Sequence, residues 1–114
     1  MKTLIAIPLV LMSLVSFPSW GLTMEDLVER KGVYYEKFSD VPFTGQINEG
    51  LVRGSIKSGR RIDDWIMFWP NGQLAGKGYF KNGEREGYWE LYKSDGTLWK
   101  EFTGTYKNGV KVND

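Results

Sequence analysis

A repeat of 24 residues runs through the second half of the chain and constrains its fold more than any other feature. One copy, residues 54–77, contains the segments GSIKSG, DWIMF and NGQL. The next copy, residues 78–103, carries GYFKNG, YWELY and DGTL at positions offset by 24. A third, truncated copy spans 104–114 at an offset of 26, so two residues are inserted after Leu98. Residues 45–50 echo the strand-and-turn start of these copies.

Turn-forming dipeptides punctuate the repeats at intervals of 11 to 13 residues: Ser58-Gly59, Asn71-Gly72, Asn82-Gly83, Asp95-Gly96 and Asn108-Gly109. Asn-Gly and Asp-Gly accept positive φ at both central positions of a turn, so they predict two-residue hairpins. The runs between them are rich in aromatic and β-branched residues, which favours strands. Because one hairpin alone buries too little apolar surface, we expect the hairpins to stack along one axis. The predicted fold is all-β: a single-layer antiparallel meander of stacked β-hairpins.

Glycines at equivalent positions indicate how this meander forms a core. Gly54, Gly78 and Gly104 each precede an apolar strand residue by two positions. A residue without Cβ allows an aromatic side chain from a neighbouring hairpin to pack close to the backbone. We therefore predict that Trp65 and Trp89, which are equivalent in the repeat, form the rungs of the core. The alternation along these strands leaves open which face is buried.

The first 21 residues have the pattern of a cleaved signal peptide. Lys2 supplies a positive start, residues 4–15 are largely apolar, and Ser19 and Gly21 are small residues at the minus-three and minus-one positions. The apolar run is shorter than the ~20 residues of a spanning helix, which favours cleavage over an uncleaved anchor. We expect a periplasmic or secreted protein, with no stable membrane insertion after cleavage.

Residues 22–53 are less regular and are expected to form an N-terminal cap and a degenerate repeat. Thr23 and Asp26 favour one capped helical turn. The alternative is a hairpin across Lys31-Gly32, and a hairpin from Val33 onward is the preferred prediction. No linker and no second domain are indicated.

Composition excludes several function classes. The chain has no Cys and no His, so it lacks a thiol nucleophile, the commonest general base and the commonest transition-metal ligand. Lys and Arg number 15 and Asp and Glu 14, which gives a formal net charge of +1, and removal of Lys2 with the signal leaves a neutral chain. A neutral chain argues against nucleic acids and anionic membrane surfaces as partners. No cofactor is expected.

The repeat unit resembles the MORN-repeat variant, in which Gly-x-aromatic-Lys-Asn-Gly is followed by Trp-x-x-Tyr and Asp-Gly-x-Leu. These elements lie here at 78–83, 89–92 and 95–98, and the resemblance covers roughly residues 32–112. With the lead-in VPFTG at 41–45, the pattern is similar to bacterial proteins grouped as the YwqK family of toxin–antitoxin components. That resemblance implies an antitoxin that binds and neutralises a cognate toxin, and it brings no catalytic residues.

The aromatic side chains are the strongest candidates for a binding surface. Exposed Trp and Tyr anchor protein interfaces, and the same side chains stack on sugars. The candidate partner-binding residues are Trp65, Phe68, Trp69, Tyr88, Tyr92 and Trp99. Trp69 and Trp99 stand out because Lys93 and Ala75 occupy the matching positions in the other copy. We expect a non-enzymatic module that binds a protein partner; the alternatives are a cell-envelope carbohydrate-binding module and plain core packing of these aromatics.

Two acidic pairs, Asp63-Asp64 and Glu84 with Glu86, follow turns at equivalent repeat positions. Paired carboxylates are typical of glycoside hydrolysis, and carboxylate oxygens also bind Ca²⁺. The interpretation that we favour is that these residues are solvated and keep strand edges soluble. We therefore predict neither an enzyme nor a metal site.

Two further features bear on partners. The doublet Arg60-Arg61 suits a phosphate or an acidic partner, but Asp63-Asp64 follows closely and predicts local neutralisation. The last strand, around Val110, leaves an edge that favours self-association or a partner's strand. The alternative is that Lys107 and Lys111 prevent such pairing, because charged side chains protect a strand edge.

Overall fold

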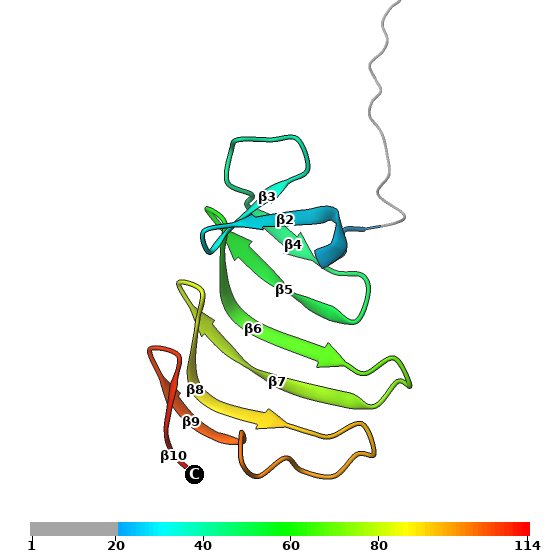
Figure 1. Ribbon diagram of the computed structural model, residues 1–114, viewed down its shortest axis with the longest axis vertical. Helices are drawn as coiled ribbons and strands as arrows, with labels where there is room; N and C mark the ends of the chain where they lie inside the picture. The colour runs from blue at the N-terminus through cyan, green and yellow to red at the C-terminus, as the bar shows by residue number, and fades with distance from the viewer. Residues whose placement is uncertain (1–20) are drawn as a thin grey trace, which may run out of the picture.

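The computed structural model describes residues 21–114, so most of the predicted signal peptide lies outside the described residues. Figure 1 shows a ladder of strands with one short 3₁₀-helix near its N-terminal end. The elements are η2 (Met24–Asp26), β2 (Leu27–Arg30), β3 (Val33–Glu36), β4 (Gly45–Ile47), β5 (Val52–Lys57), β6 (Arg60–Phe68), β7 (Leu74–Lys81), β8 (Glu84–Leu91), β9 (Gly104–Lys107) and β10 (Val110–Asn113). No helix among the described residues is long and apolar enough to cross a membrane.

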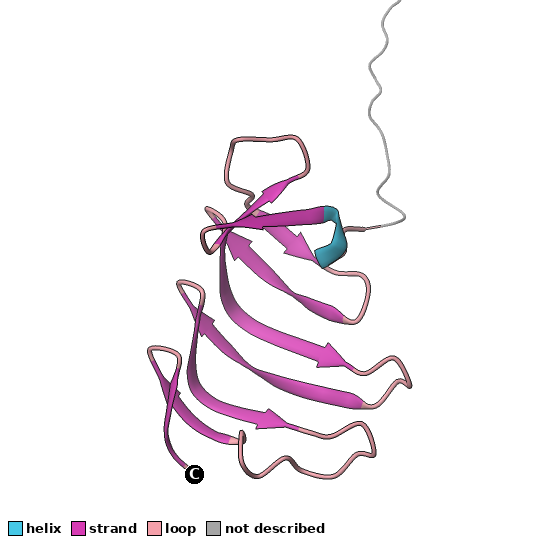
Figure 2. Ribbon diagram, viewed as in Figure 1, coloured by secondary structure: helices cyan, strands magenta, loops and turns pink. Residues whose placement is uncertain are grey.

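The predicted all-β fold is confirmed. Seven strands form one sheet in the order β10-β9-β8-β7-β6-β5-β4, and β2 and β3 form a separate hairpin. Each strand of the large sheet pairs antiparallel with its neighbour in sequence, which is the connectivity of a meander. Figure 2 shows these strands stacked along one axis.

Three of the five predicted turns are two-residue hairpins. In the turn at Asn82-Gly83 both residues have positive φ, 50° and 87°, and Lys81 pairs with Glu84 across it. Ser58-Gly59 and Asn108-Gly109 have the same geometry. These φ signs belong to a turn whose twist matches the twist of the flanking strands.

The other two turns are wider than predicted. β6 and β7 pair last at Phe68 and Leu74, which leaves a five-residue loop around Asn71-Gly72. Only the glycine has positive φ, and Asn71 Oδ1 instead accepts a hydrogen bond from the Gln73 backbone N–H at 2.9 Å. Asp95 makes the equivalent bond to the Thr97 N–H at 3.0 Å. The acidic or amide side chain therefore closes a local turn that replaces the two-residue hairpin.

A bulge recurs once in each full repeat and bends β6 and β8. Arg53 pairs with Ile66 and Ser55 with Ile62, so three residues of β6 (63–65) face Gly54 alone. In the next copy, three residues of β8 (87–89) face Gly78 alone. Figure 1 shows the curvature of both strands. The bend turns one face of the sheet inward.

Asp63 and Gly87 begin these bulges and explain a difference between the two copies. Both adopt positive φ, 64° and 76°. Asn and Asp are the residues besides glycine that visit this region most readily, so Asp63 fulfils the backbone role of Gly87.

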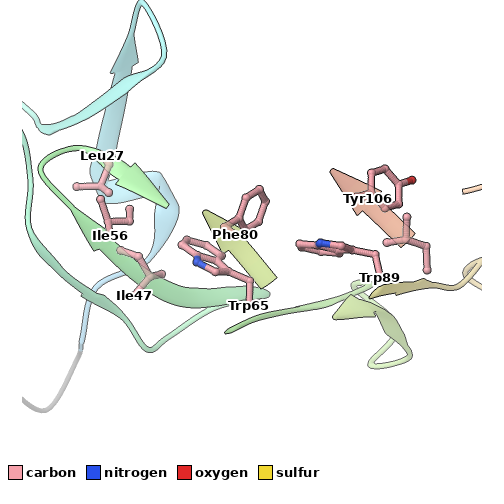
Figure 3. Packing of buried hydrophobic residues seen from close by; sticks show 8 residues of the cluster. Leu27, Ile47, Ile56, Trp65, Phe80, Trp89 and Tyr106 are labelled. Carbon is pink, nitrogen blue, oxygen red and sulfur yellow. The ribbon is translucent and has the colours of Figure 1, made fainter. Parts of the chain in front are cut away.

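The inward face, here called the inner face, carries the core. Trp65 and Trp89 are 2% and 0% exposed, which confirms their prediction as rungs. Phe80 stands between them with T-shaped contacts at centroid distances of 5.8 and 5.0 Å (Figure 3). The other core side chains are Leu27, Ile47, Ile56, Leu91 and Tyr106. The alternating residues, including Ile66 and Tyr88, point to the opposite side, here called the outer face.

The strand at residues 45–47 is not the echo that its sequence indicates. Gly45 matches the start of β9 in sequence, but β4 runs in the direction of β6 and β8. Ile47 pairs with Gly54, as Trp65 pairs with Gly78 and Trp89 with Gly104. Ile47 is therefore the structural counterpart of the two rung tryptophans.

The N-terminal residues combine the two predicted alternatives. Thr23 and Asp26 form a capping box on η2, and β2 and β3 then form a hairpin across Lys31-Gly32. Backbone hydrogen bonds join this hairpin to the large sheet, for example from Tyr34 N–H to the Gly59 oxygen at 2.8 Å. Leu27 packs on the core at this end (Figure 3).

The two inserted residues lie in the connection between β8 and β9. Thr103 is the one buried polar residue of the described chain, and its hydroxyl accepts from the Leu91 N–H at 2.9 Å and donates to the Leu91 oxygen at 3.1 Å. In the first copy Met67, the counterpart of Leu91, pairs with Gly76 of β7. The Thr103 side chain thus replaces a strand partner where the insertion displaces the backbone.

Candidate binding surfaces

Of the six candidate aromatics, Trp65 is not on the surface. Its indole lies over Gly54, where an added Cβ would be 2.5 Å from the ring Cγ. Its Nε1–H donates to the backbone oxygens of Ile62 at 2.9 Å and Ser55 at 3.2 Å. The prediction that Trp65 is an exposed partner-binding residue is therefore wrong, because its buried side chain cannot contact a partner.

Trp69 and Tyr92 are half-buried and join two neighbouring loops. Trp69 Nε1–H donates to the Tyr92 backbone oxygen at 3.0 Å, and Asn71 Nδ2–H donates to the Ser94 oxygen at 2.8 Å. These bonds connect the β6–β7 loop to the β8–β9 connection. They give Trp69 a structural reason to differ from its counterpart Lys93.

Phe68 and Trp99 are also half-buried. The Arg53 guanidinium carbon lies 5.4 Å from the centre of the Phe68 ring. Trp99 packs on the core and meets the Phe102 ring in a T-shaped contact at 5.1 Å. Trp99 lies in the β8–β9 connection that carries the insertion, whereas Ala75, at an offset of 24, lies within β7.

Tyr88 is the one candidate whose side chain is mostly in solvent, with 54% exposure. Tyr79 on the neighbouring strand β7 is 43% exposed, and sequence reasoning did not select it. Its position next to the buried Phe80 is the signal that identifies it, because successive strand residues point to opposite faces. The two tyrosines give the outer face its exposed aromatic surface.

A hollow of about 330 Å³ lies beside Tyr88 on this face. It is lined by Asp64, Trp65, Ile66, Lys77, Gly78, Tyr88 and Glu90. Lys77 Nζ lies 4.0 Å from Glu90 Oε1, and the Tyr92 hydroxyl donates to the same oxygen at 3.0 Å. That hydrogen bond raises the pKa of Tyr92 above its ordinary value. The hollow thus combines an aromatic ring with charges of both signs.

The acidic residues that the sequence pairs make separate contacts in the structure. Asp63 begins the bulge of β6 and accepts a hydrogen bond from the Tyr79 hydroxyl at 3.4 Å, whereas Asp64 lines the hollow beside Tyr88. Glu86 Oε1 accepts a hydrogen bond from the Asn108 backbone N–H at 3.1 Å. Asp64 and Glu90 line the hollow beside Tyr88, because the strand pairing brings them to the same face. Residues 21–114 contain no cluster of three or more acidic side chains arranged for a metal.

The arginine doublet is not neutralised by its neighbouring aspartates, which corrects the prediction. Within residues 21–114 the ion pairs join Arg30 to Asp40, Lys77 to Glu90 and Lys111 to Asp114. Arg61 lies on the inner face, and its guanidinium carbon is 4.2 Å from the centre of the Phe80 ring.

Strand β10 forms the C-terminal edge of the sheet. Three of its residues pair with β9, with a register shift between Lys111 and Asn113. Lys111 Nζ lies 2.9 Å from Asp114 Oδ1, and its hydrogen bond and charge lower the pKa of that carboxyl below its ordinary value. A register shift and a charge pair are features that blunt a sheet edge. Self-association through this edge stays a prediction.

No protein-family model matches the chain, and no curated protein or solved structure matches it significantly.

Proposed function

We propose that the chain is a non-enzymatic protein-binding repeat module of the cell envelope, periplasmic or secreted, whose outer sheet face contacts a protein partner. The observation that carries the proposal is the pair Tyr79 and Tyr88, which are 43% and 54% exposed on neighbouring strands. Tyrosine is an amphipathic anchor that protein interfaces favour. The strands beneath are packed together by the T-shaped contacts of Trp65, Phe80 and Trp89 on the other face of the sheet.

The sharper form of the proposal is that the partner is a cognate toxin, which this protein neutralises as an antitoxin or immunity protein. The support for this form is the resemblance of the repeat to the MORN variant and the YwqK family. It needs no catalytic residue, since neutralisation requires a stable complex alone.

Affinity capture tests the proposal. The purified chain is immobilised and exposed to the envelope and secreted fractions of the producing cell, beside the double variant Tyr79→Ala, Tyr88→Ala. The matched control is Phe38→Ala, which removes a fully exposed aromatic from the loop after β3. We expect one stoichiometric protein that the chain and the control retain and the double variant loses. Retention of no protein, or equal retention by the double variant, would contradict the proposal.

A second candidate function is carbohydrate binding, and the hollow beside Tyr88 favours it specifically. A volume of about 330 Å³ suits one or two sugar rings, and Asp64 and Glu90 offer acceptors for hydroxyl groups beside an aromatic ring. Retention on murein or polysaccharide that is lost in Asp64→Asn and Glu90→Gln would establish this function. Retention unchanged in both variants would reject it.

A further inference from the structure

Two arginines on the inner face occupy equivalent positions in successive repeats. Arg61 pairs with Ile56 and Arg85 pairs with Phe80, one repeat further along the sheet. Both side chains therefore point to the face that carries the core. They lie on the opposite side of the sheet from the tyrosines of the proposed partner surface.

Aromatic rings hold both guanidinium groups. The guanidinium carbon of Arg61 lies 4.2 Å from the centre of the Phe80 ring and 5.9 Å from that of Tyr34. The corresponding distances from Arg85 are 4.9 Å to Trp89 and 5.3 Å to Tyr106. These distances are within the range of cation–π contacts, which place each guanidinium against aromatic rings on the inner face.

Most of these N–H groups have no partner within the described protein. Arg61 Nε is buried without a hydrogen bond, the one side-chain atom of residues 21–114 in that state. Arg85 donates a single long bond of 3.5 Å to the Tyr106 hydroxyl, and neither guanidinium forms an ion pair among the described residues. A buried donor without a partner is costly, which makes Arg61 unusual for a folded chain.

In the third copy the cation at this position, Lys111, has acceptors for its N–H groups. Lys111 stands opposite Tyr106, as Arg85 stands opposite Phe80. Its Nζ donates to the backbone oxygens of Lys100 and Glu101 and pairs with Asp114. Among the described residues, no equivalent acceptors surround Arg61 and Arg85. Donors without partners are therefore a feature of these two arginines, and the repeat does not require them.

Two adjoining hollows, of about 290 and 200 Å³, lie at Arg61 and share it with Gly83 and Glu84. Arg85 and Phe80 line the larger one, and Arg60 and Glu29 line the smaller one. Three arginines and two glutamates leave one unit of positive charge across the two hollows. That balance suits a monoanion better than a doubly charged phosphate.

We propose that Arg61 and Arg85 form a binding site for a carboxylate group. A carboxylate is planar and singly charged, and it accepts two parallel hydrogen bonds from one guanidinium. Bound here, it would supply acceptors to the donors of Arg61 and Arg85 and offset the excess charge. Its source is either an acidic side chain of a peptide or a small free carboxylate.

Nuclear magnetic resonance on the full chain tests this site through the arginine Nε–H signals. The probes are tetraglutamate and tetraglutamine peptides, both acetylated at the N-terminus and amidated at the C-terminus, together with sodium acetate and inorganic phosphate. We expect tetraglutamate to shift the Arg61 and Arg85 signals with saturation and tetraglutamine to leave them unchanged. Saturation by acetate at a similar concentration would support the site with a small carboxylate as its ligand, whereas a requirement for the peptide would assign the acidic segment.

Conservative variants separate a site from a structural role. Arg61→Lys keeps the charge but loses the planar fork, so we expect binding to weaken roughly tenfold or more. Arg53→Lys is the matched control, because Arg53 also stacks on an aromatic ring but lies on the outer face and donates to the Gly50 oxygen at 2.8 Å. Absence of a saturable shift, equal binding by Arg61→Lys, or tighter binding of phosphate than of either carboxylate probe would overturn the proposal. Loss of protein capture in the tyrosine variants leaves these outcomes unaffected.

Discussion

Gly78→Ala is expected to destabilise the chain by about 3 kcal/mol, at the upper end of the range for overpacked cores. An added Cβ would lie 2.5 Å from Trp89 Cγ and closer still to Cδ2 and Cε2. The ring cannot move aside freely, because Trp89 is fully buried and stacks against Phe80 at 5.0 Å. Gly78 is not among the residues with positive φ, so the cost is steric and not conformational.

Urea unfolding followed by tryptophan fluorescence measures this loss. For a domain of this size, a loss of about 3 kcal/mol lowers the melting temperature by roughly 12–24 °C. A double-mutant cycle with Trp89→Phe tests the cause, since a smaller ring relieves the clash and the two effects should not add. A loss below about 1 kcal/mol, or strict additivity in the cycle, would refute the argument that Gly78 exists to admit the indole.

Three further predictions follow from local contacts. Thr103→Val keeps the shape of the side chain but leaves the Leu91 N–H and oxygen without partners. We therefore expect the free energy of unfolding to fall by about 1–3 kcal/mol and hydrogen exchange at the Leu91 amide to become faster. Unchanged exchange would contradict this. Asp63→Val should lower the free energy of unfolding in urea by about 1–2 kcal/mol, because a β-branched residue is strained at a φ of 64°. Asp63→Gly should lower it little, and equal losses in the two variants would argue against backbone strain. Hydrogen bonds from the Thr97 backbone N–H and then its hydroxyl lower the pKa of Asp95, so this stabilisation is complete above the ordinary Asp pKa and disappears as pH falls through the lowered value. Thr97→Val should raise the Asp95 pKa in an NMR titration, and an unchanged pKa would reject the role of the hydroxyl.

The repeat predicted the fold because its signals are local. Asn82-Gly83 specifies a tight turn by backbone conformation, and Trp65 and Trp89 are identified by their fixed offset from glycines that lack a Cβ. The wide turn at Asn71 was missed because the competing Asn71–Gln73 hydrogen bond depends on where the strands stop pairing.

The candidate surface was harder to predict because burial of an aromatic depends on pairing between strands. The sequence of β6 is consistent with Trp65 as an anchor or as a core rung, because apolar side chains alternate onto both faces of this strand. Tyr79 was passed over, although Phe80 beside it is buried and requires the tyrosine to point outward. The convergence of Asp64 and Glu90 needed the register of β6, β7 and β8, which no single segment of sequence contains.

The assignment of inner and outer faces underlies both proposals, and hydroxyl-radical footprinting with mass spectrometry tests it most directly. Native and urea-unfolded protein are oxidised in parallel, and the rate at each side chain is taken as a ratio between the two states. We predict that Trp65 and Trp89 are strongly protected in the native state, while Tyr79 and Tyr88, at 43% and 54% exposure, keep a large part of their unfolded oxidation rates. Oxidation of Trp89 as fast as that of Tyr88 in the native protein would contradict the account.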